Sequence, residues 1–378
     1  MSAILLKQTP ISVRVPILKV VGLGGGGCNT INRMMELGFS GVEYIGANTD
    51  GQALNSCLAP TKIQLGPRLT RNLGAGGDPK VGEAAAEESF KTLHEVLAGA
   101  DMVFLTAGMG GGTGTGAIPV AARVARSLGA VTIAIVSTPF SFEVGNRQQN
   151  AREGLERLRP FTDTLITIPN DRLMQIAPHD LSLDLAFRLA DDVLRQGIQG
   201  ISEIITQTGL INVDFAHVRQ LMQMGGGALF SIGYGEGHDK ALKAVENALH
   251  HPLLESIALE DAGGIIANFT AGSEITFLEI NDALKHLHQK TGNRAGIIPG
   301  VLTDDRLNDR VQVILVITGI GATPTDVALG DKKVQPTENP FVHTPVAHDL
   351  PALESASLEL VGTPAGLDLP AFLRRRLR

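Results

Sequence analysis

A run of glycine and threonine, Gly108-Met109-Gly110-Gly111-Gly112-Thr113-Gly114-Thr115-Gly116, follows the apolar segment 102–106 and leads into sequence with helical periodicity. Glycine lets the backbone turn sharply and approach a ligand closely, because no Cβ holds the ligand away. A loop of this kind between a strand and a helix presents free backbone amides and the positive end of the helix dipole to an anion. The alternative, glycines that only permit a tight turn, does not require so long a run. The run therefore predicts a phosphate-binding loop.

A second loop of the same kind, Val20-Val21-Gly22-Leu23-Gly24-Gly25-Gly26-Gly27-Cys28-Asn29, also links an apolar segment to a helical one. Alone, it would suit a Rossmann dinucleotide site, with Asp50 near the position of the ribose-binding acid of such a site. A nicotinamide-dependent oxidoreductase is therefore the alternative function. A pyrophosphate needs one such loop, whereas two converging loops suit a triphosphate held from two sides. Neither loop contains Gly-x-x-x-x-Gly-Lys-Ser/Thr, which excludes a P-loop enzyme.

Around these loops, short apolar runs alternate with helix-period stretches, as in βαβ units. We expect an N-terminal, Rossmann-like α/β domain whose parallel sheet is covered by helices. Its strands are predicted at 17–21, 42–47, 102–106, 131–136 and 164–168, and its helices at 28–37, 81–96, 116–127 and 147–158.

Apolar residues then recur at helical spacing from 183 to 205, which predicts one long central helix. A polar turn at 206–212 and a short helix at 214–224 follow. A second, smaller α/β domain is expected over 224–321. Its strands are predicted at 228–234, 264–270, 297–302 and 311–318, and its helices at 240–249 and 274–289.

The 378 residues, 43% of them hydrophobic, suffice for one large or two ordinary domains. The apolar runs are too short to cross a bilayer, which excludes a transmembrane protein. Cys28 and Cys57 are the two cysteines and cannot make a disulfide framework, and the first 16 residues lack the features of a signal peptide. We therefore expect the protein to reside in a reducing cytoplasm. The net charge of −7 argues against a protein that coats nucleic acid.

Beyond residue 321 the composition shifts to proline, threonine, acids and small residues, which is typical of a flexible, disordered linker. The last residues differ, because an apolar segment at 367–373 is followed by arginines. A segment of this kind at the end of a tether is typical of a docking peptide that becomes ordered on binding. The alternative is a frayed basic terminus without a partner.

Segment 110–116 resembles the signature of the tubulin/FtsZ family. Other segments are similar to the bacterial FtsZ branch of that family, namely 24–29, 48–50, 74–79, 139–143, 168–171, 212–216 and 369–374. The resemblance covers about residues 17–321 and the last dozen. It implies an N-terminal extension (1–16), a GTP-binding domain (17–182), a central helix with a catalytic loop (183–223), a C-terminal α/β domain (224–321), a linker (322–365) and a partner-binding peptide (366–378).

The family binds GTP on one face of the N-terminal domain, so GTP and GDP are the expected ligands. At the phosphates the resemblance implies Gly25, Gly26, Gly27, Cys28 and Asn29 from one loop and Gly112, Thr113 and Gly114 from the other. It implies Glu143 and Arg147 beside the ribose and phosphates, and Asn170, Phe187 and Asp191 at guanine. A carboxylate such as Asp191 accepts from N1 and the exocyclic amine of guanine, which adenine cannot offer, and Phe187 offers a flat apolar face. By helical spacing alone, Phe187 would suit the core equally well.

The resemblance also implies a GTPase that a second copy completes. Protomers stack head to tail, and the loop before Asp214 enters the GTP site of the next protomer. A contact of this kind does not close on itself and generates filaments. Asn212 and Asp214 match polar residues that orient water and a cation opposite the γ-phosphate. Mg²⁺ is the expected cation, with K⁺ as a further candidate, and no residue is assigned as a metal ligand.

One residue of this catalytic loop departs from the family. The usual Asp-Phe-Ala-Asp is Asp214-Phe215-Ala216-His217 here, so the second carboxylate is replaced by an imidazole. His217 can act as a general base but carries no negative charge. Losing one charge-stabilising group often costs about 10²-fold in rate, so we expect slowed hydrolysis. The alternative is that this position tolerates several polar residues. Asp78, where the family more often has Asn, would either weaken GTP binding or face solvent or a metal.

The implied role is that of a filament-forming GTPase of the bacterial division ring, on the cytoplasmic side of the membrane at mid-cell. A paralogue that copolymerises but barely hydrolyses GTP is the alternative. The implied partners are further copies of the chain, membrane-tethering proteins of the FtsA or ZipA kind, and division inhibitors. The residues implied in docking a tethering protein are Leu369, Pro370, Phe372, Leu373 and Arg374. Neither nucleic-acid binding nor direct membrane insertion is expected.

Overall fold

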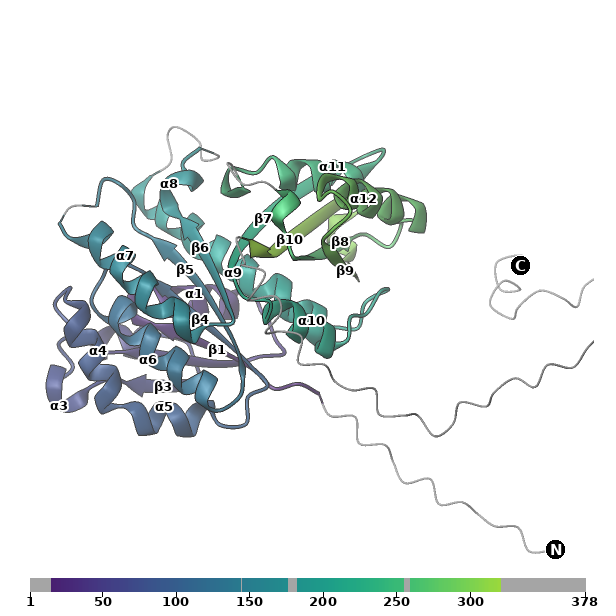
Figure 1. Cartoon of the computed structure of the whole chain (residues 1–378). Coiled ribbons are helices and arrows are strands. Elements are labelled where there is room, and N and C mark those ends of the chain that lie inside the picture. The colour runs from purple at the N-terminus through teal and green to yellow at the C-terminus, as the bar shows by residue number, and fades with distance from the viewer. Residues whose placement is uncertain (1–14, 144, 176–181, 255–258, 321–378) are drawn as a thin grey trace, which may run out of the picture. The chain divides into compact units, whose positions relative to one another are not determined.

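The computed structural model describes residues 15–143, 145–175, 182–254 and 259–320 (Figure 1). Most of the expected N-terminal extension, the linker 322–365 and the docking peptide 366–378 lie outside these residues. The strands are β1 (Leu18–Leu23), β2 (Glu43–Asn48), β3 (Thr61–Gln64), β4 (Met102–Gly108), β5 (Val131–Thr138), β6 (Thr164–Pro169), β7 (Gly227–Glu236), β8 (Gly264–Ala271), β9 (Gly296–Thr303) and β10 (Arg310–Ile320).

Helices connect these strands along the chain (Figure 1). The α-helices are α1 (Gly24–Glu36), α2 (Gly51–Ser56), α3 (Pro67–Thr70), α4 (Pro79–Glu88), α5 (Phe90–Leu97), α6 (Thr113–Ser127), α7 (Arg147–Leu158), α8 (Asn170–Leu173), α9 (Leu183–Thr206), α10 (Phe215–Met222), α11 (Lys240–Leu249) and α12 (Phe277–Lys290). No helix within the described ranges is long and apolar enough to cross a bilayer. The mixed α/β architecture predicted from the sequence is confirmed.

The strands follow the order β3-β2-β1-β4-β5-β6-β7-β10-β8-β9. The six strands from β3 to β6 are all parallel, as the βαβ pattern predicts. In the C-terminal part, β10 pairs with β7 and β8 in antiparallel fashion, and β8 pairs with β9 in parallel. The pair Ile166 and Ala228 joins β6 to β7. The two predicted sheets therefore meet in one continuous strand order, which the sequence did not predict.

Helices pack on both faces of the parallel strands. One buried apolar cluster joins α1, α9 and α10 to one face, and a second joins α4, α5, α6 and α7 to the other face. A third cluster lies between α11, α12 and the C-terminal strands. The central helix α9 contacts α1 and β5 as well as β8, β9 and β10. It therefore packs against strands from both parts of the chain.

Two helices begin earlier than the sequence predicts. Helix α1 starts at Gly24 rather than Cys28, and α6 starts at Thr113 rather than Gly116. The glycine runs themselves form the first helical turn, because a residue without Cβ fits where the helix presses on its neighbours. First-turn amides have no partner inside a helix. The amides of both loops are therefore those best placed to bind an anion.

The predicted helix 81–96 is two helices, α4 and α5, that meet at Ser89. The Ser89 hydroxyl accepts from the amide of Gly66 at 2.9 Å and donates to the carbonyl of Gln64 at 3.3 Å. A hydroxyl that bonds backbone groups elsewhere competes with the regular helix. Helix α3 and strand β3, which these bonds hold, have four residues each and were not predicted.

Candidate functional site

A cavity of about 370 Å³ lies where β1, β4 and β5 end and their loops begin. Carboxyl ends of parallel strands meet at one edge of a sheet, which is where open α/β sheets bind ligands. Eleven of the residues implied by the resemblance line it, namely Gly25, Gly26, Asn29, Gly112, Thr113, Gly114, Glu143, Arg147, Asn170, Phe187 and Asp191. The lining also contains Leu23, Gly108, Met109 and Gly111, which belong to the two predicted loops but were not singled out, and four residues that sequence reasoning missed, namely Ser137, Thr138, Pro139 and Ala190.

The two glycine loops touch each other beneath the cavity. A Cβ on Gly24 would lie 2.8 Å from the amide nitrogen of Gly114, and one on Gly26 would lie 3.1 Å from that of Gly108. Gly24 also has a φ of +70°, a conformation that favours glycine. The loops therefore converge only because side chains are absent at their contact.

Two glycines face open space instead. A Cβ on Gly25 or Gly111 would meet no heavy atom within 4 Å, and both residues line the cavity. Behind the second loop, the Thr113 hydroxyl is 2.6 Å from the hydroxyl of Thr49, which fixes the loop from outside the cavity. The empty space above bare backbone is of the kind that a phosphate group fills at a helix N-terminus.

Glu143 and Arg147 form an ion pair at the rim. The Arg147 guanidinium donates to Oε2 of Glu143 at 2.6 Å, and Oε1 of Glu143 accepts from the amide of Phe140 at 2.9 Å. Both carboxylate oxygens of Glu143 are thus hydrogen-bonded, and one of them fixes the position of Arg147. The arginine side chain remains half exposed and is the cation among the lining residues.

The other end of the cavity is suited to a flat polar ring. Asn170 is buried, and its Oδ1 has no hydrogen-bond partner within the described residues. Phe187 is 40% exposed and meets the ring of Phe140 edge to face at 5.4 Å between centroids. Phe187 therefore lies at the cavity wall and is not fully buried in the core. An orphaned amide oxygen beside an open aromatic ring fits a heterocycle that donates hydrogen bonds.

Burial raises the pKa of Asp191 to about 7. Arg33 acts in the opposite direction and Asp192 adds to the rise. An aspartate that titrates near neutral pH in a cavity is a candidate for ligand recognition, because a bound donor can stabilise its ionised form.

Two residues implied at the phosphates lie outside the cavity lining. A Cβ on Gly27 would collide with the carbonyl oxygen of Thr106, so Gly27 lies against the sheet. Cys28 is buried beneath the loop. Asp50 and Asp78 are also absent from the lining, and each caps a helix: Asp50 accepts from the amides of Gln52 and Ala53, and Asp78 from that of Lys80.

The predicted catalytic residues lie beyond the other end of α9. Asn212 Oδ1 accepts from the amide of Gly209 at 2.7 Å, and Asp214 caps α10 by accepting from the amide of Ala216 at 2.9 Å. His217 is exposed on the first turn of α10. None of these three residues lines the glycine-loop cavity.

The length of α9 separates the two sets of residues. Asp191 is the ninth residue of this 24-residue helix, and the catalytic loop begins after Thr206. At 1.5 Å per residue, this places the start of the loop about 22 Å along the helix from the cavity. The amide of Leu210 then donates to the carbonyl of Val301 in β9 at 2.8 Å, which holds the loop on the C-terminal strands. One chain therefore does not bring its own loop to its own cavity.

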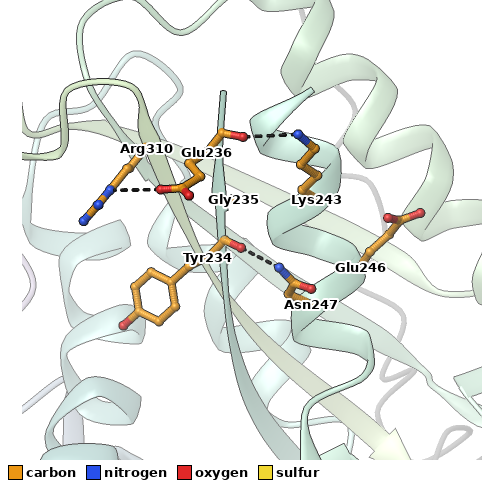
Figure 2. A pocket seen from close by; sticks show the side chains of 7 residues that line it. All are labelled: Tyr234, Gly235, Glu236, Lys243, Glu246, Asn247 and Arg310. Atoms are coloured by element: carbon orange, nitrogen blue, oxygen red, sulfur yellow. Dashed lines mark hydrogen bonds and ion pairs between the residues drawn. The ribbon is translucent and has the colours of Figure 1, made fainter. Parts of the chain in front are cut away.

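A larger hollow of about 600 Å³ lies over β7 and α11 (Figure 2). Asn247 donates to the carbonyl of Tyr234 at 2.7 Å, and Lys243 donates to that of Glu236 at 3.3 Å (Figure 2). Strand β7 pairs with β6 at Ala228 only, so these side chains cover a free strand edge. The polar groups of this hollow thus have structural partners, unlike Asn170 in the glycine-loop cavity.

Comparison with known proteins assigns the family. Residues 17–178 match the GTPase domain of the tubulin/FtsZ family, and residues 226–321 match the FtsZ family C-terminal domain. An empty FtsZ dimer from M. jannaschii has 43% sequence identity and a TM-score of 0.78, with 81% of this chain and 89% of that chain covered. CetZ2 from Haloferax volcanii, solved as a GTPγS-bound protofilament, has 19% identity and a TM-score of 0.69, with 83% and 97% covered, and shares the fold. The chain therefore belongs to the tubulin/FtsZ family, as a GTPase domain followed by an FtsZ C-terminal domain.

Proposed function

We propose that this chain binds GTP in the glycine-loop cavity and stacks head to tail into filaments of the bacterial division ring, with GTP hydrolysed at the contact between copies. The observation that carries the proposal is the separation of the cavity from Asp214, which lies beyond the far end of α9. A GTPase of this family in which nucleotide and catalytic loop lie apart needs a second copy to join them. The unclosed contact that results generates a filament.

The lining residues divide by the chemistry that they offer to GTP. Gly25, Gly26, Gly112, Thr113 and Gly114 contribute backbone groups to the phosphates, and Arg147 contributes a positive charge near them. Gly27 and Cys28 support the first loop from below.

No group of three or more acidic, histidine or cysteine side chains that could hold a metal occurs within the described ranges. A Mg²⁺ ion would therefore be held chiefly by the phosphates themselves, where it neutralises their charge.

Asp191 and Asn170 select guanine over adenine in this proposal. The ionised carboxylate accepts from N1–H and the exocyclic amine, and the orphaned Oδ1 of Asn170 gains a donor. A site whose buried polar groups need the ligand's donors discriminates strongly against a base that lacks them. Phe187 covers the ring face with its exposed side.

We predict that the affinity for GDP rises with pH through neutrality. Protonated Asp191 accepts only poorly, and its pKa of about 7 leaves roughly a tenth of it ionised at pH 6 and roughly nine tenths at pH 8. The dissociation constant should therefore fall by about tenfold between pH 6 and pH 8, as measured by titration calorimetry. Asp191→Asn, which cannot ionise, is the control for titration of the nucleotide itself. Equal pH slopes for wild type and variant would contradict this role.

Exposed apolar residues near both ends of α9 support self-association. Leu210 in the catalytic loop is 64% exposed, and Phe142, which stacks on Phe140 beside the cavity, is 53% exposed. A contact between copies that covered either side chain would remove its apolar surface from water, which is favourable. Head-to-tail stacking would cover both positions in the same contact.

At the catalytic loop, one carboxylate oxygen of Asp214 is used by the helix cap and the other makes no hydrogen bond within the described part of the chain. That oxygen is the one offered to water or a cation in the neighbouring site. Asn212 shapes the loop through its bond to Gly209.

His217 adds no carboxylate to this loop, so we propose that hydrolysis is slow. The same residue favours the second candidate, a paralogue that copolymerises and hydrolyses GTP only weakly. Phosphate release measured beside polymer sedimentation separates the two.

The test of the proposal is GTP turnover as a function of protein concentration. Because two copies build each catalytic site, the rate per molecule should collapse below the concentration at which polymer sediments. Nucleotide extracted from the purified protein should be GDP or GTP. A constant rate per molecule at every dilution would refute assembly of the site in trans, and extraction of NAD would refute the ligand.

The remaining partners follow from the terminal peptide. Leu369, Phe372 and Leu373 would fill a groove on a membrane-tethering protein of the FtsA or ZipA kind, with Pro370 limiting the conformational entropy lost on docking. Filaments would then be held at the mid-cell membrane indirectly. These residues lie outside the described ones, so the proposal rests on the sequence.

A further inference from the structure

Cys28 and Cys57 lie side by side beneath the first glycine loop. Gly22 of β1 and Gly46 of β2 are register partners on neighbouring parallel strands, which are about 4.8 Å apart. Cys28 Sγ is 3.9 Å from the carbonyl oxygen of Gly22, and Cys57 Sγ is 2.7 Å from the point where a Cβ of Gly46 would lie. Each sulfur therefore covers one of two adjacent glycines on the same face of the sheet.

Asn32 fixes the same arrangement from α1. It lies four residues after Cys28, so both side chains occupy one face of the helix. The Asn32 side chain donates to the carbonyl of Ser56 at 3.4 Å and accepts from the amide of Leu58 at 2.7 Å. These two residues flank Cys57, so the segment that carries Cys57 is held against the helix that carries Cys28.

The two thiols are free and differ in proton affinity. The interaction of the two sulfurs lowers the pKa of Cys57 and raises that of Cys28, because a proton kept on Cys28 stabilises a thiolate on Cys57. Lys62 also lowers the pKa of Cys57 by its charge. The thiolate is the form of cysteine that attacks peroxide, so Cys57 is the sulfur that reacts first. Cys57 is buried, and its chain neighbours Ser56 and Leu58 are exposed, so Cys57 lies close to the protein surface.

We propose that Cys28 and Cys57 are a redox-sensitive pair that closes to a disulfide under peroxide and thereby weakens nucleotide binding at the glycine loops. Hydrogen peroxide transfers one oxygen to the Cys57 thiolate, giving a sulfenic acid and hydroxide, which takes up a proton to form water. The Cys28 sulfur, losing its proton, then displaces hydroxide from the sulfenic sulfur, so that a disulfide and a second water form. In total, two thiols are oxidised by two electrons and one peroxide is reduced.

The disulfide would affect the nucleotide cavity by moving helix α1. A disulfide requires the sulfurs about 2.05 Å apart and the Cβ atoms about 3.8 Å apart, closer than two thiols in van der Waals contact. Cys28 lies between Gly27, which presses on the β4 backbone, and Asn29, which lines the cavity. Cys57 lies over Gly46 of β2, on the side of β1 away from β4, so drawing Cys28 toward Cys57 pulls the first turn of α1, and Asn29 with it, away from its seat against β4. This step rests on the proposed nucleotide site, whereas formation of the disulfide does not.

The experiment treats the nucleotide-free full chain with hydrogen peroxide and follows intact mass, free thiols after denaturation, and GDP affinity. We expect the loss of two hydrogen atoms, both thiols blocked, and binding about tenfold weaker, since one charge-assisted hydrogen bond is worth roughly that factor. Dithiothreitol should restore all three. Cys57→Ser should bind GDP as the reduced wild type does and keep that affinity after peroxide.

The outcomes separate the two steps. Monomer without an internal disulfide, or with the cysteines linked between chains, would overturn the pairing, since the chain has no other cysteine. An internal disulfide with unchanged GDP affinity would overturn the effect on the loops. Loss of GDP affinity in peroxide-treated Cys57→Ser would assign the effect to other oxidation. Reduced wild type that binds no GDP at all would instead refute the proposed nucleotide site, while mass and thiol measurements would still decide the pairing.

Discussion

Asp214→Ala is expected to bind GDP with the affinity of the wild type and to turn over GTP about 10²–10³-fold more slowly, as for removal of one group that stabilises the transition state. The cavity does not include Asp214, so binding within one chain is unaffected. The variant also loses the cap of α10, which costs about 1 kcal/mol of stability. Asp214→Asn keeps a capping side chain and removes the charge, so it separates the two effects. Wild-type turnover by Asp214→Asn would show that the charge of this residue does not take part.

Mixing two inactive variants tests trans-completion directly. Asp214→Ala keeps the cavity intact, and Asp191→Ala keeps the catalytic loop intact while losing its contact with guanine. If the site forms between copies, a cavity of the first can receive a loop of the second. Random stacking of an equal mixture would build such a site at roughly one contact in four, so turnover should return to a visible fraction of the wild-type rate. A mixture as inactive as its components would refute the proposed geometry.

His217→Asp probes the departure of this chain from its family at the same loop. A carboxylate on the exposed first turn of α10 adds negative charge beside Asp214, where a cation opposite the γ-phosphate would be stabilised. Turnover per assembled subunit should rise, by up to about 10²-fold if a full stabilising group is restored. Rates are compared at equal mass of sedimented polymer, so that a change in assembly is not mistaken for catalysis. An unchanged rate would mean that the second carboxylate is dispensable here.

The two glycine loops could be predicted from the sequence because all the residues of each loop are close together in the chain. Each glycine loop follows its strand and opens its helix within a few residues, so β1–α1 and β4–α6 were identified from pattern alone. Within a loop, pattern did not tell the glycines apart. Gly25 faces the cavity while Gly27 lies against β4, and only the tertiary contacts distinguish them. Gly108 and Gly111 belong to the glycine and threonine run 108–116 and also line the cavity, so the run as a whole marks the site better than single glycines within it.

Other features of the site and fold depend on packing between distant parts of the chain and could not be predicted from sequence patterns. Asn170 and Asp191 come from separate elements, α8 and α9, and reach the cavity because β6 and α9 pack beside β5. Their placement was implied by family resemblance and not by any spacing in the chain. The division of helix 81–96 at Ser89 depends on partners some 25 residues away, and the junction of β6 with β7 rests on one residue pair. Such features leave almost no signal in local periodicity.

Gly111→Ala is expected to fold normally and to lose about 100-fold in affinity for GDP. The added methyl group meets no protein atom within 4 Å, and the residue is not in the left-handed region. Stability should therefore equal that of the wild type or exceed it by about 0.5 kcal/mol, because alanine restricts the unfolded chain. The same methyl group occupies the space above the backbone that a phosphate needs. Displacing the phosphate loses one or two charge-assisted hydrogen bonds, which accounts for the expected factor.

Two further glycine variants make this result diagnostic. Gly296→Ala also meets no atom within 4 Å but lies in β9, away from the cavity, so it should bind GDP normally. Gly116→Ala would press its methyl group onto the Pro79 carbonyl and come within 2.5 Å of the Glu83 amide, so it should lose about 3 kcal/mol of stability. Thermal unfolding and calorimetric titration of all three thus distinguish glycines kept for the ligand from glycines kept for packing. Normal GDP binding by Gly111→Ala would mean that the phosphates lie elsewhere than against this loop.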